Sequence, residues 1–89
     1  MEYNFKLRDE SLGHVIAEGK TNSTGLHAIL FRFCGITIPE RLRFMDTLLT
    51  DGKCEHIVRT GSVGLNAYSI AVWDEEKLKV VNPKWTTRF

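Results

Sequence analysis

Hydrophobic and polar residues alternate at the start of the chain. Tyr3, Phe5 and Leu7 are separated by polar residues, and a period of two is typical of a strand with one buried face. The turn-forming residues 9–13 then lead to a short apolar run at 15–17. The pattern predicts a second strand that forms a hairpin with the first.

The segment at 24–34 can be interpreted in two ways. Its β-branched and aromatic content suits a buried strand, whereas its spacing suits a helix. We favour the helix, because Ser23 or Thr24 can cap its start and Gly35 stands where a left-handed residue would end it. The apolar residues at helical spacing are Leu26, Ile29, Leu30 and Phe33.

A second helix is predicted from Thr37 to about Thr50. Thr37 and Glu40 have the spacing of a capping box, Pro39 suits the first turn, and Asp51-Gly52 follows the end. We expect this helix to face the core with a stripe that Phe44 and Leu48 widen. The stripe itself consists of Ile38, Leu42, Met45 and Leu49.

Three further strands are expected at 54–60, 65–73 and 78–82, with turns at 61–64 and 74–77. Residues 65–82 would then form a β-hairpin, and Pro83 would end its second strand. The order β-β-α-α-β-β-β predicts a small α+β domain, residues 1–89, in which two helices cover one face of a mostly antiparallel sheet. Residues 83–89 are expected to form an extended C-terminal tail.

Composition limits the kinds of partner. The 89 residues are 43% hydrophobic and 26% charged, with a net charge of +1, which is typical of a globular chain without an overall field for polyanions. No apolar run reaches the roughly 20 residues of a membrane span. The N-terminus lacks the pattern of a secretory signal, so we expect a cytoplasmic protein with Cys34 and Cys54 reduced.

Candidate catalytic and metal-binding groups are sparse. Cys54 and His56 form one close pair, but structural zinc sites usually need a second pair across a spacer. We therefore predict no metal, no cofactor and no catalytic residue. The sequence Gly61-Ser62-Val63-Gly64 could approach a phosphate backbone, although a turn explains its glycines better.

The order of the predicted elements is similar to the layout of papain-like cysteine peptidases. The resemblance places Thr24 and Asn66 at the positions of the catalytic cysteine and histidine, and Asn82 at the orienting position. An amide cannot act as a general base. The resemblance therefore implies a catalytically inactive relative.

Basic and aromatic residues alternate near the C-terminus. Basic side chains can neutralise phosphates while aromatic rings stack on bases, so nucleic-acid binding is one hypothesis. The competing interpretation is that Lys77 and Lys79 protect an edge strand and Trp85 packs over the core. The residues of the nucleic-acid hypothesis are Lys77, Lys79, Lys84 and Arg88.

The favoured hypothesis is a non-catalytic regulator or inhibitor that binds another protein, of the kind that phages and other mobile elements encode. An exposed sheet edge can accept a strand or form a symmetric homodimer. Aromatic and arginine side chains dominate such interfaces. The candidate contacts are Trp85, Phe89 and Tyr68, with Arg88 and Lys84 on the rim.

Overall fold

The computed structural model describes residues 1–58 and 67–89. Its elements are β1 (Tyr3–Asp9), β2 (His14–Thr21), α1 (Ser23–Arg32), α2 (Ile38–Asp51), β3 (Lys53–His56), β4 (Tyr68–Trp73) and α3 (Glu75–Val81). The four strands form an antiparallel sheet in the order β2-β1-β4-β3. The α+β class and the order of the first six elements are confirmed. The seventh element is a helix, where the sequence predicted a strand.

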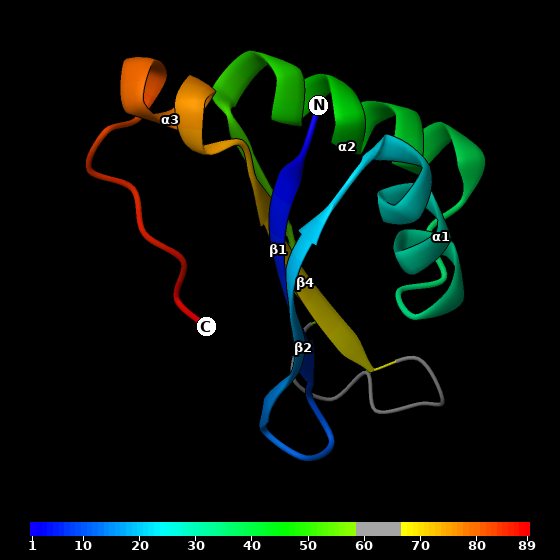
Figure 1. Ribbon diagram of the computed structural model, residues 1–89. Coiled ribbons are helices and arrows are strands. Elements are labelled where there is room, and N and C mark those ends of the chain that lie inside the picture. Colours follow the sequence, from blue (N-terminus) through cyan, green and yellow to red (C-terminus); the bar gives the residue numbers. More distant parts are fainter. Residues whose placement is uncertain (59–66) are drawn as a thin grey trace.

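The core lies between the sheet and the two longer helices. Tyr3 and Leu7 of β1 join Ile70 and Val72 of β4 in one buried cluster. Each helix contributes two of its buried side chains to that cluster: Leu26, Leu30, Phe44 and Leu48. Figure 1 shows the sheet nearly edge-on, with α1 on one side and the C-terminal tail, residues 83–89, on the other. The prediction of two helices on one face is confirmed.

The helix ends only partly follow the predicted caps. α1 is capped by Asn22, whose side chain accepts a hydrogen bond from Gly25 N at 2.9 Å, so Ser23 and Thr24 are not its caps. Gly35 has the expected positive φ of 61°. The capping box at Thr37 is absent, because the Thr37 side chain makes no capping hydrogen bond.

The predicted hairpin at 65–82 is wrong, and the sheet order gives the reason. β4 is a central strand, with β1 on one side and β3 on the other, so no open edge beside β4 remains for a following strand. Asp74 instead caps α3 by accepting hydrogen bonds from Glu76 N and Lys77 N. The residues expected to form a turn are thus a helix cap and first turn, in which acidic side chains are favoured.

α3 is held against the end of α2. Asp74 N donates to Gly52 O at 2.9 Å, and Asn82 Nδ2 donates to Asp51 O at 3.0 Å. Leu78 is the buried residue of α3, whereas Val80 is 80% exposed. In the part of the chain that the structure describes, no helix is long and apolar enough to cross a membrane.

Candidate binding surface

The sheet face away from α1 and α2, here called the tail face, is covered by the C-terminal tail. Because directly paired residues share a face, the strand register places Lys6, Ala71 and Glu55 together on it. Ser69 and Ala71 of this face are fully buried. α1 and the tail lie on opposite sides of the sheet (Figure 1), so the tail contributes to this cover.

Side chains of the tail alternate between sheet and solvent. Trp85, Thr87 and Phe89 are half-buried, while Thr86 and Arg88 between them are exposed. Lys6 Nζ donates to Phe89 O at 3.4 Å, and Arg88 Nε lies 3.6 Å from Glu55 Oε2. The tail is therefore attached to β1 and β3 as an extended segment.

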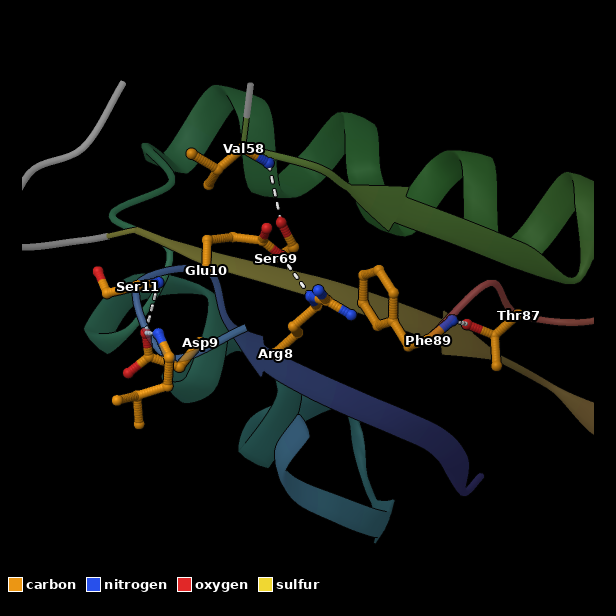
Figure 2. A network of polar contacts seen from close by, with 9 residues as sticks. Arg8, Asp9, Glu10, Ser11, Val58, Ser69, Thr87 and Phe89 are labelled. Carbon is orange, nitrogen blue, oxygen red and sulfur yellow. Dashed lines mark hydrogen bonds and ion pairs between the residues drawn. The ribbon is translucent and has the colours of Figure 1, made fainter. Parts of the chain in front are cut away.

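Polar groups of the sheet below the tail are paired with one another. Val58 N donates to Ser69 Oγ at 2.9 Å, and Arg8 Nε lies 3.1 Å from Glu10 Oε1 (Figure 2). Figure 2 also shows Phe89 and Thr87 of the tail, where Phe89 N donates to Thr87 Oγ1 at 3.3 Å. Ser69 is fully buried, so its bond to Val58 N gives the hydroxyl a partner, whereas Arg8 and Glu10 are partly exposed.

Two tryptophans meet where the tail leaves α3. The Trp73 and Trp85 ring centroids are 5.8 Å apart at an interplanar angle of 55°, and Lys53 Nζ lies 5.8 Å from the Trp85 ring centroid. Both distances are within the range of favourable aromatic and cation–π contacts. Trp85 is thus held in place by Trp73 of β4 and Lys53 of β3.

Beside this tryptophan pair lies an open pocket of about 380 Å³, here called the tail pocket. Its apolar walls come from β4, α3 and the tail, and Glu75 and Lys79 contribute opposite charges. The complete lining is Trp73, Glu75, Leu78, Lys79, Pro83, Trp85, Thr86 and Thr87.

The structure separates Tyr68 from the other residues predicted to bind a partner. Trp85, Phe89, Arg88 and Lys84 all belong to the tail, but Tyr68 belongs to the core face of β4. Its ring packs edge-on against Phe33 of the α1 C-terminus, with centroids 5.5 Å apart. The alternation of side chains along β4 places Tyr68 on the face opposite Trp73.

The four basic residues of the nucleic-acid hypothesis do not form one row. Lys77 and Lys79 are exposed on α3, where residues two positions apart point about 200° apart around the axis. On the predicted strand they would have shared a face. Lys84 and Arg88 are exposed on the tail, and Arg88 is already beside Glu55.

Both thiols are unfavourably placed for nucleophilic chemistry. Burial raises the pKa of Cys34 to about 12, and burial is also the main cause that raises the pKa of Cys54. Burial lowers the pKa of His56, against a smaller opposing effect of Glu40. Among residues 1–58 and 67–89, no three His, Cys, Asp or Glu side chains gather as metal ligands.

The layout that resembled a papain-like peptidase is also changed. Thr24 does lie in the first turn of α1, but Asn82 ends α3 and donates to Asp51 O, where the resemblance required a strand. Asn66 and the turn predicted at 61–64 lie outside the described residues. Comparison with known proteins finds no family model, no curated protein and no solved structure that matches the chain.

One exposed apolar surface, on α2, was not predicted from the sequence. Only Phe44 and Leu48 of α2 are buried, while Ile38, Leu42 and Leu49 are 64%, 56% and 52% exposed. The expectation that the Ile38–Leu49 stripe faces the core is therefore wrong. The sequence did contain a signal for this exposed surface. The apolar residues of α2 span about 160° around the helix axis, which is more than one contact with a sheet covers.

Proposed function

We propose that this protein is a non-catalytic binding module that regulates or inhibits another protein by occupying its surface. The tail pocket is the observation that supports this proposal most strongly. It presents two tryptophans, a leucine and a proline next to one acidic and one basic side chain. Apolar pockets with a charged rim are typical of the centres of protein interfaces.

The size of the pocket suits an inserted side chain of a partner protein. Its volume of about 380 Å³ is near the low end of small-molecule pockets, which span about 300–1,000 Å³. It is also open to solvent along the tail. A large apolar side chain of the partner would lie on Trp73 and Trp85, and acidic groups around it would meet Lys79 of the pocket and the exposed Lys84 of the tail.

The walls of the pocket are already ordered before a partner arrives. Trp85 is positioned by Trp73 and Lys53, and the tail is tied to Lys6 and Glu55 further along. Binding therefore costs little side-chain entropy at these positions. A preordered aromatic surface is what a small inhibitor needs for tight binding.

Affinity capture from the native cell lysate tests the proposal. The tagged protein is compared with Trp85→Ala, with Lys79→Glu on the pocket rim, and with Leu12→Ala in the β1–β2 turn as the matched control. We expect one nuclease-resistant protein partner to be retained by wild type and Leu12→Ala and lost by both pocket variants. Retention by both pocket variants would contradict the proposed site.

The nuclease arm distinguishes the nucleic-acid hypothesis, which the exposed Lys84 and Arg88 on the tail still support. If nucleic acid carries the binding, captured proteins disappear on nuclease treatment, and affinity falls steeply with salt because phosphate contacts release counterions. Replacing Lys84 and Arg88 with Gln would then matter more than Trp85→Ala. That combination of results would replace the protein-binding proposal.

A further inference from the structure

α2 carries an apolar stripe that the rest of the described chain leaves open. We define the α2 stripe as Ile38, Leu42, Met45 and Leu49, whose directions fall within about 60° around the helix axis. Met45 is partly buried, and the other three are more than half exposed. Contiguous exposed apolar side chains of this kind mark interaction sites.

The spacing of the stripe is self-complementary. Its four positions are symmetric about the midpoint between Arg43 and Phe44, so an antiparallel copy of α2 brings Ile38 opposite Leu49 and Leu42 opposite Met45. Every apolar side chain then faces another. We propose that this face pairs two copies of the chain through antiparallel α2 helices related by a two-fold axis.

The charges beside the stripe support the same arrangement. Arg43 and Asp46 are both exposed on the same side of the stripe, about 130° and 70° from its centre around the helix axis, and neither has an ion-pair partner among the described residues. A two-fold antiparallel pair brings this flank against its own copy. Arg43 of one copy then lies within about 3 Å, measured along the helix axis, of Asp46 of the other.

The opposite flank argues against a parallel pair. In a parallel pair the Asp46 flank would face Arg41. The Arg41 guanidinium is turned towards α1 instead, where its carbon lies 5.2 Å from the Phe31 ring centroid and Nη1 donates to His27 O at 3.3 Å. Phe31, at the end of α1, is 62% exposed beside Arg41.

The contact is short, so the expected dimer is weak. The α2 stripe is about 17 Å long, and interfaces of this size fall at the small end of specific protein contacts. We expect a monomer–dimer equilibrium in the micromolar range. This dimer is independent of the tail pocket, since the stripe and the pocket share no residue.

Sedimentation velocity over a concentration series tests the pairing. Wild type should shift from monomer to dimer, Leu42→Glu should remain monomeric, and Leu12→Glu, an equally exposed control in the β1–β2 turn, should behave as wild type. Circular dichroism checks that each variant is folded. A wild-type monomer at hundreds of micromolar, or a dimer that survives Leu42→Glu, would overturn the proposal.

Charge variants test the antiparallel orientation. Arg43→Glu or Asp46→Arg alone creates two like-charge contacts and should weaken the dimer about tenfold or more. An equimolar mixture of the two variants should recover wild-type association, because each contact across the axis is again between opposite charges. Failure of the mixture to recover would rule out this register.

Discussion

Gly52 follows α2 and packs against α3. Its lack of a side chain makes this close packing possible. Its φ is +74°, and a Cβ atom there would lie 2.9 Å from Leu78 N. Gly13 has a similar φ of +77° with nothing within 4 Å of the same atom. Both glycines thus need a positive φ, but only Gly52 is in close contact with another part of the chain.

Replacing each glycine with alanine separates these two effects. Gly13→Ala should cost about 1 kcal/mol for the left-handed conformation. Gly52→Ala should cost about 1–3 kcal/mol more, because backbone and core must move. Urea unfolding measures both free energies, and equal values would contradict the close packing of α3 on Gly52.

Burial of Cys34 predicts a pH dependence of stability. Its pKa is raised from the ordinary value of 9.0 to about 12, so above pH 9 the unfolded chain ionises first. The free energy of unfolding should therefore fall as pH rises from about 9 towards 12, with the full contribution present below 9. The measurement is urea unfolding across that range.

Other groups also ionise at alkaline pH, so the informative quantity is a difference in slope. Cys34→Ala should lose stability less steeply with pH than wild type, although packing loss lowers its stability at every pH. Parallel pH profiles for the two proteins would show that the Cys34 thiol is not buried as described.

Among the elements, β1, β2 and both long helices could be predicted from local patterns. The alternation at Tyr3, Phe5 and Leu7 and the helical spacing of Leu26 and Leu30 reflect burial on one face. α3 could not be predicted in this way, because its type depends on β4 being central in the sheet. The adjacent Val80 and Val81 suggested a strand, yet they are 80% and 41% exposed.

The helix caps provide a prediction at this scale. Asn22→Ala should destabilise the protein by about 1 kcal/mol, because Gly25 N loses its acceptor. Thr37→Ala should cost only a few tenths, since its side chain makes no capping bond. Thermal unfolding compares the two, and a larger loss for Thr37→Ala would restore the capping box that the sequence suggested.

At the scale of the whole molecule, the C-terminal tail determines the candidate site. The composition of the C-terminus indicated Trp85, Phe89, Lys84 and Arg88. The sequence could not show that the tail lies on the sheet face opposite α1 and α2. That placement depends on long-range contacts such as Trp73–Trp85 and Arg88–Glu55. It also explains why Tyr68, on the other face, is not part of the site.

The most direct test of the central claim is hydrogen–deuterium exchange of the protein with and without its captured partner. Binding at the tail pocket should slow exchange across α3 and residues 84–87, and leave the β1–β2 turn around Leu12 unchanged. Protection confined to β2 or to α2, with α3 and the tail unaffected, would contradict the proposed binding surface.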